Sequence, residues 1–415
     1  MTEELLRKGE LAKKAAFSLA VVDTETKNRA LRAVADALLA ESKSIIEANK
    51  KDIESARKKG IREAMIDRLT LTEERIAGIA EGVRQVAALP DPIGKTVDEW
   101  TRPNGLVISR KRVPMGVIAI IFEARPNVTA DAAALCLKTS NAVILRGGSE
   151  AINSNKAIMK VMQQAAYSAG IPEGSMDIVE DTSRETAREL MRMNGYIDLL
   201  IPRGGAGLIK TVVENATVPV IETAAGNCHV YVDGDCDFDM ATKIVENAKV
   251  SRPSVCNAAE TLLIDQKIAP EYLPVIADVL KKDGVEIRAC EKCLKICPGL
   301  KAAAEEDWST EYNDYIIAVK IVDGVSEAIS HINKYNTKHS EAIVTDNPET
   351  AERFLKEVDA AAVYVNASTR FTDGFEFGFG AEIGISTQKM HARGPMGLEQ
   401  LTSIKYVIRG NGQIR

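Results

Sequence analysis

The chain has 415 residues, of which 45% are apolar and 27% are charged, the balance of a soluble protein with a large buried core. At roughly 150 residues per domain, this length predicts two or three domains. The 53 basic and 59 acidic side chains leave a net charge of −6. This charge excludes a positive field over the whole molecule that could hold nucleic acid or an anionic membrane.

Targeting and redox signals favour a cytoplasmic protein. The longest apolar run, Val113 to Phe122, is too short to span a bilayer, which takes about 20 residues. The first residues, MTEELLRKGELAKK, are charged throughout and contain no apolar core of a signal peptide. Seven cysteines, an odd number spread thinly, do not suggest a disulfide scaffold. We therefore expect a cytoplasmic α/β protein with reduced thiols.

The first part of the chain is predicted to be helical and then to change to alternating strands and helices. Residues 1 to about 90 place apolar residues three or four apart among many charges, and LPDPIG at 89–94 ends the pattern. Strands are predicted at Gly116–Phe122, Ala142–Leu145, Met176–Val179, Asp198–Ile201 and Pro219–Ile221, with helices between them such as Thr129–Lys138 and Ser154–Ala169. This alternation predicts a doubly wound parallel sheet.

A second alternation of strands and helices starts near residue 228. Strands are predicted in HVYVDGD and ETLLIDQ and at Ile316–Ile321, Glu341–Val344 and Ala361–Val365, with a helix at Met240–Ala248. The tail Ser403–Arg415 is β-like and basic, which is typical of an arm that pairs with another chain. The chain is thus predicted to hold two α/β domains and an arm.

Two glycine-bearing turns follow predicted strands and precede helical patterns. Such turns can bind phosphate because backbone N–H groups point outward at a helix N-terminus. One is PRGGAG at 202–207 and the other is LRGGS at 145–149. Neither is G-x-G-x-x-G, so an ordinary tight turn remains an equal alternative. Arg146, at the end of its strand, is suited to the 2′-phosphate of NADP, although neighbouring Glu150 weakens this interpretation.

Cys256 is the cysteine that we select as a candidate nucleophile. It lies in SVCNAA, between a helical pattern and a strand, with small neighbours and with Arg252 nearby in sequence. A thiol becomes reactive when nearby positive charge stabilises the thiolate. A lone cysteine is more often an inert core residue, and Cys136, on an apolar helix face, fits that description.

The roles of two further groups of residues are left open by the sequence. Cys290, Cys293 and Cys297 form C-x2-C-x3-C, but no fourth cysteine or nearby histidine completes a zinc or iron–sulfur site, so we expect no metal. His391 stands with Lys389 and Arg393 in a small basic cluster that could bind an acidic substrate or could be a solvated loop.

Several stretches resemble the γ-glutamyl phosphate reductases (glutamate-5-semialdehyde dehydrogenases) of the aldehyde dehydrogenase superfamily. The most specific is VDGVSEAISHINKYNTKHSEAI at 322–343. FEARPN, IETAAGNCHVYVD, SVCNAAETLL, FGFGAEIGIST and KMHARGPMGLE are also similar to that family, so the resemblance covers the whole chain.

The resemblance implies an aldehyde-dehydrogenase-like α/β fold with two domains and an arm. Residues 1–224 would form a nucleotide-binding domain to which 386–401 return, and 225–385 would form the catalytic domain. Residues 98–113 and 402–415 would form an arm that joins subunits into a homo-oligomer.

The implied reaction is NADPH-dependent reduction of L-glutamyl 5-phosphate to glutamate 5-semialdehyde, the second step of proline synthesis from glutamate. The substrate is a small molecule, and functional coupling to glutamate 5-kinase is expected. Residue by residue, Cys256 corresponds to the nucleophile. Its backbone N–H is the expected oxyanion donor, with Asn127 as a weaker candidate for a side-chain donor. The cofactor NADPH/NADP+ would contact Arg146, Ser149, Gly204, Gly205 and Glu311.

Glu222 corresponds to the glutamate that activates water in hydrolytic aldehyde dehydrogenases, which a reductase does not need. We expect one of three roles for Glu222. Its side chain turns away and activates no water, it transfers protons to and from the thiol, or it serves as a structural carboxylate at a strand end. Arg125, Arg252, Arg370 and Arg393 are candidates for the substrate anions, because Arg donates bidentate hydrogen bonds.

Two alternatives remain beside the reductase. One is a hydrolytic NAD(P)-dependent aldehyde dehydrogenase, for which Glu222 is the main support. The other is a nucleotide-binding protein of this fold without turnover. A metalloprotein built on the three clustered cysteines is a distant third.

Overall fold

The computed structural model describes residues 1–223 and 225–415, which divide into two compact units. Unit 1 comprises Met1–Thr223, Gly378–Gly384 and Met396–Arg415, and unit 2 comprises Ala224–Phe377 and Ile385–Pro395. The domain boundary expected at residue 224 lies outside the described residues. Of the expected return segment 386–401, the part up to Pro395 belongs to unit 2 and the part from Met396 belongs to unit 1.

Unit 1 opens with helices, as the apolar periodicity predicts. They are α1 (Glu3–Leu19), α2 (Thr24–Ala40), α3 (Ser42–Lys58), α4 (Glu63–Leu69) and α5 (Glu73–Ala88). Thr2, Asp23 and Thr72 each accept a backbone N–H bond from the residue three positions on, and so cap α1, α2 and α5.

A four-stranded parallel sheet forms the centre of unit 1. Its strands are β3 (Val117–Phe122), β4 (Ala142–Arg146), β5 (Met176–Ile178) and β6 (Leu199–Arg203), in the order β5-β4-β3-β6. The helices after it in chain order are α6 (Asn127–Lys138), η1 (Ser149–Ala151), α7 (Ile152–Ser168), α8 (Arg184–Leu190) and α9 (Ala206–Asn215). Every residue of β3 is buried, which explains its unbroken apolar sequence VIAIIF.

The predicted strand at Pro219–Ile221 is wrong. The structure has a single bridge there, between Val220 and Leu200. Proline has no N–H to donate, so Pro219 contributes only its carbonyl, which accepts from Leu200 N–H at 2.9 Å.

The strand order of unit 1 creates a switch point between β3 and β6. From β3 the chain proceeds through β4 to β5 on one side, and then crosses to β6 on the other side. In open parallel sheets, ligands bind beyond the carboxyl ends of the strands where the order reverses. At this point β3 leads to Glu123 and β6 leads to Gly204 and Gly205.

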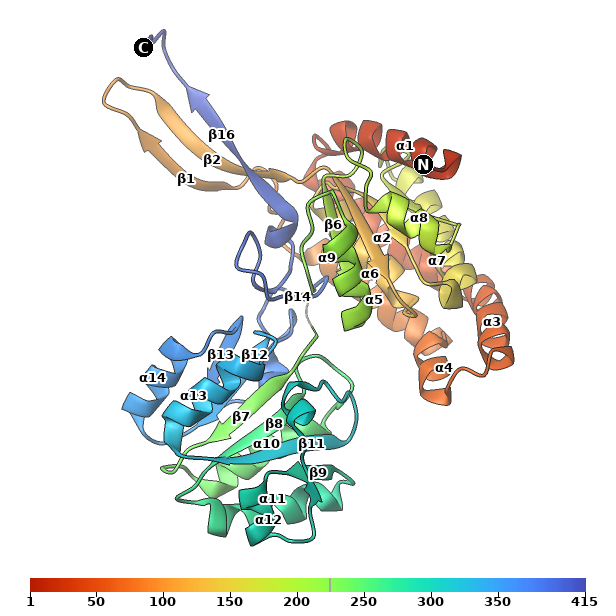
Figure 1. Cartoon of the computed structure of the whole chain (residues 1–415). Helices are drawn as coiled ribbons and strands as arrows, with labels where there is room; N and C mark the ends of the chain where they lie inside the picture. Colours follow the sequence, from red (N-terminus) through yellow and green to blue (C-terminus); the bar gives the residue numbers. More distant parts are fainter. Residues whose placement is uncertain (224) are drawn as a thin grey trace. The chain divides into compact units, whose positions relative to one another are not determined.

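Three antiparallel strands of unit 1 form an arm (Figure 1). β1 (Thr96–Thr101) pairs with β2 (Val107–Pro114), which pairs with β16 (Thr402–Arg409). Trp100 and Tyr406 contact each other edge to face, while Ile408 remains 59% exposed. Among the described residues, β1 and β16 each pair along one side only.

Unit 2 is built on a seven-stranded parallel sheet (Figure 1). Its order is β10-β9-β11-β8-β7-β12-β13. The strands are β7 (Cys228–Val232), β8 (Ala259–Asp265), β9 (Glu286–Ala289), β10 (Lys301–Ala302), β11 (Ile316–Val322), β12 (Ser340–Val344) and β13 (Ala362–Val365). The helices are α10 (Phe238–Val250), α11 (Ala269–Lys282), α12 (Glu291–Ile296), η2 (Glu305–Ser309), α13 (Gly324–Tyr335), α14 (Pro348–Glu357) and η3 (Thr369–Phe371).

Alternate residues of these strands face two separate cores. In β7, Val230 and Val232 pack with α10, α11 and α12, whereas Tyr231 packs with α13 and α14. In β8, Leu263 likewise faces the second core. Helices therefore cover both faces of the sheet, which is the doubly wound arrangement.

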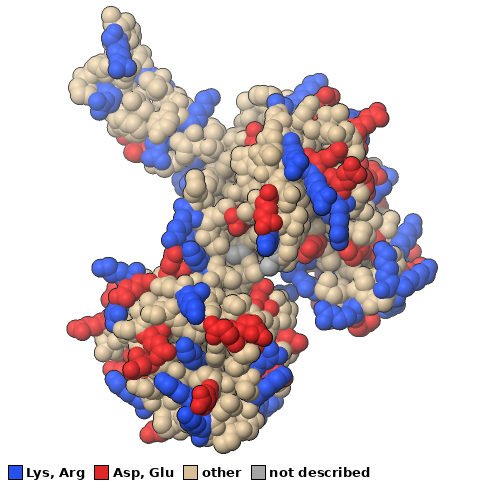
Figure 2. All heavy atoms as spheres, in the orientation of Figure 1, with Lys and Arg blue, Asp and Glu red and all other residues tan. Residues whose placement is uncertain are grey.

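Short elements lie near the C-terminus of the chain. β14 (Ile385–Ser386) pairs with β15 (Gly394–Pro395) in unit 2, and η4 (Glu399–Leu401) precedes β16 in unit 1. Basic and acidic side chains are interspersed on each unit in the view of Figure 2. Within residues 1–223 and 225–415, no helix has both the length and the apolar character needed to cross a bilayer.

Candidate active site

Cys256 lies in a turn at the amino-terminal edge of the unit 2 sheet, between α10 and β8. The turn is closed by the N–H of Ala258, which donates to the Val255 carbonyl at 3.0 Å. The Cys256 residue is partly exposed, as a nucleophile must be.

The segment that leads into β7 packs against the backbone of Cys256 and restrains it. A Cβ atom on Gly226 would lie 1.4 Å from the Cys256 carbonyl oxygen and 2.2 Å from its carbonyl carbon. The same oxygen accepts a hydrogen bond from the Cys228 thiol at 3.2 Å. Glycine is therefore required at 226 for this close approach of two backbone segments.

We expect Gly226→Ala to displace Cys256 and to lower kcat of the enzyme by about 10²-fold, the typical effect of moving a reacting group by 1 Å. The matched control is Gly299→Ala, since a Cβ there meets nothing within 4 Å. Steady-state kinetics of both variants check this result. Equal activity of Gly226→Ala and the parent chain would contradict it.

Asn257 anchors the turn to the segment that follows β13. Its side-chain amide donates to the carbonyls of Arg370, at 3.2 Å, and Thr372, at 3.0 Å. Its own carbonyl accepts from the Thr369 hydroxyl at 2.7 Å. With a further bond from the Arg370 guanidinium to Asn257 Oδ1, the residue next to Cys256 is held by four hydrogen bonds across more than 100 positions of sequence.

Arg370 lies near Cys256, and Arg252, four positions before Cys256 in sequence, lies near Arg370. The Arg370 guanidinium donates to Asn257 Oδ1 and to Ser251 Oγ, the second at 3.1 Å. Burial and the neighbouring Arg252 charge lower the pKa of Arg370, whereas Cys256 raises it. These positive charges favour the thiolate form of Cys256.

The other cysteines near the strands are suited to packing rather than to catalysis. Burial raises the pKa of the Cys136 thiol well above its usual range and does the same for Cys228. Burial, with the nearby carboxylates, raises the pKa of Cys236 to about 12. All three therefore stay protonated at neutral pH.

Glu311 is brought to the same edge of unit 2. Its Oε1 atom accepts the backbone N–H of Gly226 at 2.7 Å. Gly226 in turn contacts the Cys256 peptide, so Glu311 is linked to the backbone of the candidate nucleophile through this one glycine. The sequence did not indicate this contact.

The glycine turn of unit 1 lies at the switch point of its sheet. Gly204 and Gly205 connect β6 to α9, and the Gly205 N–H donates to Glu123 Oε2 at 2.9 Å. A Cβ on Gly204 would come within 2.6 Å of that carboxylate oxygen and 2.8 Å of Leu208. The Glu123 carboxylate thus accepts a hydrogen bond at the N-terminus of α9, the kind of position at which helices bind phosphate.

Arg146 closes β4 and points toward the start of α8. Its guanidinium donates to the carbonyls of Thr182 and Ser183, and burial lowers its pKa. Arg146 Nε is buried and has no hydrogen-bond partner among the described residues. Ser149 begins η1 three residues later, after two glycines.

The remaining candidates of unit 1 are exposed or half-buried. Asn127 starts α6, and its Nδ2 donates to Asp131 Oδ2 at 3.0 Å, so its amide is engaged within the helix. Arg125 is exposed, and Glu222 is half-buried just beyond the bridge at Val220.

Arg393, unlike Arg370, is engaged by an acidic partner. It forms an ion pair with Asp359 at 2.7 Å, and Lys389 binds the same carboxylate at 2.8 Å. Lys389 and Arg393 lower the pKa of Asp359 to about 2. Asp359 therefore neutralises one of the two positive charges of the predicted basic cluster, and exposed His391 lies between Lys389 and Arg393 in a left-handed conformation.

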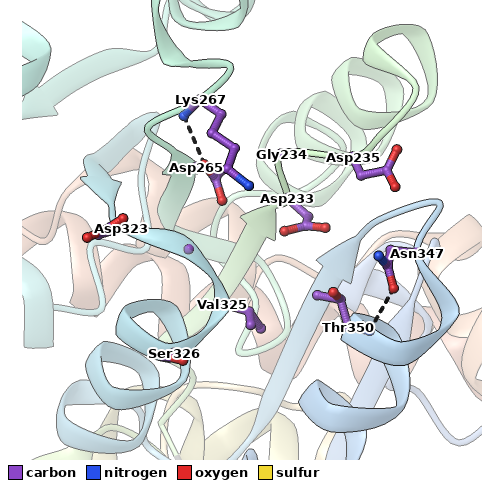
Figure 3. Close-up of a pocket in the computed structure, with 11 residues that line it drawn as sticks. Asp233, Gly234, Asp235, Asp265, Lys267, Asp323, Val325, Ser326, Asn347 and Thr350 are labelled. Carbon is purple, nitrogen blue, oxygen red and sulfur yellow. Dashed lines mark hydrogen bonds between the residues drawn. The ribbon is translucent and has the colours of Figure 1, made fainter.

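Unit 2 also contains an acidic cavity of about 410 Å³ at the carboxyl-terminal edge of its sheet (Figure 3). Among its lining residues are Asp233, Asp235, Asp265 and Asp323, with Lys267. The Tyr231 hydroxyl lies 2.9 Å from Asp233 and 3.0 Å from Asp265. This concentration of carboxylates disfavours a phosphorylated substrate or a dinucleotide.

Within residues 1–223 and 225–415, no three His, Cys, Asp or Glu side chains are grouped to hold a metal ion. Cys290 and Cys293 lie close together, with their sulfur atoms 3.5 Å apart, whereas Cys297 lies at the other end of α12.

The sequence matches the model of the aldehyde dehydrogenase family over residues 2–293 and 308–407. The chain belongs to the aldehyde dehydrogenase family. A relative within it, the γ-glutamyl phosphate reductase of Clostridium perfringens, is 62% identical over 415 residues and is covered completely, as is this chain. The crystal structure of γ-glutamyl phosphate reductase from Thermotoga maritima has a TM-score of 0.98 at 51% identity, with complete coverage of both chains.

Similarity to a more distant solved structure shows the fold alone. An acetylating aldehyde dehydrogenase from Geobacillus thermoglucosidasius has a TM-score of 0.70 at 18% identity, over 100% of this chain and 98% of that one. The predicted aldehyde-dehydrogenase-like fold and the resemblance to γ-glutamyl phosphate reductases are both confirmed. The chain is therefore an oxidoreductase of this family, and it uses a nicotinamide nucleotide.

Three residues of the site escaped the sequence analysis: Gly226, Asn257 and Glu123. Gly226 and Asn257 were part of quoted motifs, AAGNC and SVCNAA, but no local pattern assigned them a contact. Glu123 follows a predicted strand directly, and the rule that ligands bind at carboxyl ends of parallel strands was the signal that could have found it.

Proposed function

We propose that the chain catalyses NADPH-dependent reduction of L-glutamyl 5-phosphate to L-glutamate 5-semialdehyde and phosphate, the second step of proline synthesis from glutamate. The observation that carries this proposal is a partly exposed Cys256, fixed by its backbone and electrostatically coupled to Arg370, which Arg252 neighbours. Full-length similarity to γ-glutamyl phosphate reductases supports the substrate.

In the proposed mechanism, the Cys256 thiolate attacks the acyl carbon of the substrate and expels phosphate, which leaves a thioacyl enzyme. When bound, NADPH supplies the hydride that reduces this thioester. The resulting thiohemiacetal collapses to the aldehyde and regenerates the thiolate.

Each addition to the acyl carbon creates an oxyanion, which needs donors already in position. We assign this role to the Cys256 backbone N–H, because its peptide is restrained by Gly226, Cys228 and Asn257. Asn127 is the proposed side-chain donor, and in that role its amide would leave Asp131.

The substrate carries a phosphate and an α-carboxylate, and we assign its anionic groups to arginines. Arg252 and Arg370 are favoured because of their electrostatic coupling to each other and, for Arg370, to Cys256. Arg125 remains a candidate, whereas Arg393 would first have to leave Asp359.

Glu222 has no required role in a reductase, since water attack on the thioacyl enzyme would hydrolyse the activated substrate. We propose that it is turned away from the acyl group or that it transfers a proton to or from Cys256.

The residues of unit 1 fit a nicotinamide dinucleotide. Gly204 and Gly205 allow close approach to the start of α9, and the buried Nε of half-buried Arg146, which has no partner among the described residues, is available to an anion. We propose that Gly204 and Gly205 hold the pyrophosphate, that Arg146 and Ser149 hold the adenosine ribose with its 2′-phosphate, and that Glu311 holds the nicotinamide ribose.

The arm and the nature of the substrate suggest partners. Unpaired edges of β1 and β16 are suited to pairing with another copy of the chain, so we propose a homo-oligomer. An acyl phosphate is a reactive mixed anhydride, which favours functional coupling to glutamate 5-kinase in the cytoplasm.

Oxidation of glutamate 5-semialdehyde by NADP+, with and without inorganic phosphate, tests the proposed function. We expect turnover to depend on phosphate, because phosphate captures the thioacyl enzyme, and to be faster with NADP+ than with NAD+. Turnover to free glutamate without phosphate would instead support a hydrolytic aldehyde dehydrogenase. No turnover under either condition would contradict both.

Removal of the Glu123 charge should strengthen cofactor binding. Its carboxylate accepts from Gly205 N–H, where we assign the pyrophosphate, and two anions repel each other there. We expect Glu123→Gln to bind NADPH about five- to ten-fold more tightly, as measured by quenching of protein fluorescence. Glu214→Gln, near the other end of α9, is the matched control and should leave the Kd unchanged. Weaker binding by Glu123→Gln would contradict this assignment.

A further inference from the structure

Two cysteines of unit 2 form a close dithiol that the proposed reaction does not use. Cys290 directly follows β9, and Cys293 lies on α12. Their sulfur atoms are 3.5 Å apart. Cys290 is partly exposed, whereas Cys293 is completely buried. One thiol is therefore open to a reagent, and the second can be reached only through the first.

The environment of Cys290 stabilises its thiolate. The backbone N–H of Ile321 donates to Cys290 Sγ at 3.5 Å. The neighbouring Cys293 thiol lowers the pKa of Cys290 below its usual range, although burial opposes this effect. Cys293 itself lies 3.6 Å from the Val319 carbonyl, and the adjacent Cys290 raises its pKa. The pair thus consists of one activated thiol and one protonated thiol.

The dithiol is separate from the proposed active site within unit 2. Cys290 follows the carboxyl end of β9, whereas Cys256 precedes the amino end of β8. Because β9, β11 and β8 are parallel neighbours, these positions lie at opposite edges of the sheet. Reaction at Cys290 can therefore be measured independently of reaction at Cys256.

We propose that Cys290 and Cys293 form a redox-active dithiol that exchanges with low-molecular-weight disulfides. The Cys290 thiolate attacks one sulfur of a disulfide RSSR, which forms a mixed disulfide and releases one thiolate. Cys293 then loses its proton, attacks Cys290 Sγ and displaces the second thiolate. The chain loses two electrons and two protons, and RSSR becomes two RSH molecules.

The geometry suits this closure. The two sulfur atoms must approach by about 1.5 Å to reach the length of a disulfide bond, roughly 2.05 Å. The bond closes a ring that contains only the two residues between them, Glu291 and Lys292, so little of the fold has to move.

Mass spectrometry of the full-length chain tests the proposal. The protein is equilibrated in mixtures of oxidised and reduced glutathione, quenched in acid, alkylated and digested. We expect an internal Cys290–Cys293 disulfide, with Cys297 alkylated in the same peptide. In Cys293→Ser, glutathione should remain attached to Cys290, at least about ten-fold more than in the parent chain. Cys297→Ser is the matched control and should behave as the parent chain does.

Three outcomes would overturn the proposal. They are a stable glutathione adduct on Cys290 of the parent chain, pairing of Cys293 with Cys297, and alkylation of both Cys290 and Cys293 after full equilibration with oxidised glutathione. The parent chain alone distinguishes these outcomes, so the conclusion does not depend on the folding of a variant.

Discussion

We expect Cys256→Ser to lower kcat for the oxidation of glutamate 5-semialdehyde by at least about 10³-fold. A serine hydroxyl is not ionised at neutral pH, and the charges of Arg252 and Arg370 can favour a thiolate but cannot ionise an alcohol. The expected effect is on kcat rather than on cofactor binding, because every candidate cofactor residue except Glu311 lies in unit 1.

The measurement combines steady-state kinetics with an NADPH titration of the same variant. Cys297→Ser is the matched control, since Cys297 is also partly exposed in unit 2 but directly follows α12. We expect it to keep the activity of the parent chain. Mass spectrometry should also detect a substrate-derived acyl group on Cys256 of the parent chain and none on the variant. Full activity of Cys256→Ser would refute the thioacyl mechanism.

The strands that the sequence predicted best are those buried on both faces. The run VIAIIF of β3 is apolar throughout, and in the run TLLI of β8 three apolar residues follow a single buried threonine. Strand β9, which lies between the edge strand β10 and β11, has the sequence EIRA and escaped prediction, because one exposed and one half-buried charged residue leave only two apolar positions. Pro219–Ile221 shows the opposite error, since an apolar run was extended across a residue without an N–H.

The candidate nucleophile could be selected from the sequence, but its supports could not. Cys256 is recognisable by its motif, whereas the contact with Gly226 joins backbone segments 30 positions apart. Arg370 and Arg393 are equivalent in a sequence argument. The fold separates them, because Arg393 pairs with Asp359 while Arg370 binds Asn257 beside the thiol.

A buried ion pair near the Cys256 turn should be the most sensitive point for the stability of unit 2. Lys249 Nζ, at the end of α10, lies 2.6 Å from Glu260 Oε2 in β8, and both side chains are fully buried. Glu260 also accepts the backbone N–H of Asn313 at 3.2 Å. Loss of one partner leaves the other charge buried and uncompensated, which typically costs 3–5 kcal/mol.

We therefore expect Lys249→Met to lower the free energy of unfolding by about 3–5 kcal/mol at pH 8. Burial raises the pKa of Glu260 to about 7 even with Lys249 present, well above the usual pKa of a glutamate. The folded state then binds more protons than the unfolded state, so this contribution to stability falls as pH rises from about 4.5 through the folded-state pKa. The deficit of the variant should accordingly be smaller at pH 5 than at pH 8.

Urea unfolding at both pH values measures this effect, in a Trp100→Phe background so that Trp308 reports on unit 2. Lys249→Met combined with Glu260→Gln should recover most of the loss at pH 8, because no buried charge remains.

Lys295→Met removes an exposed pair with Glu291, at 3.4 Å in the same unit, and should change the free energy by no more than about 0.5 kcal/mol. A pH-independent deficit in Lys249→Met would mean that lost packing, rather than an uncompensated carboxylate, is responsible. Lys249 precedes and Glu260 follows the turn that carries Cys256, so a loss of activity that follows the loss of stability would show that this pair also holds the nucleophile in place.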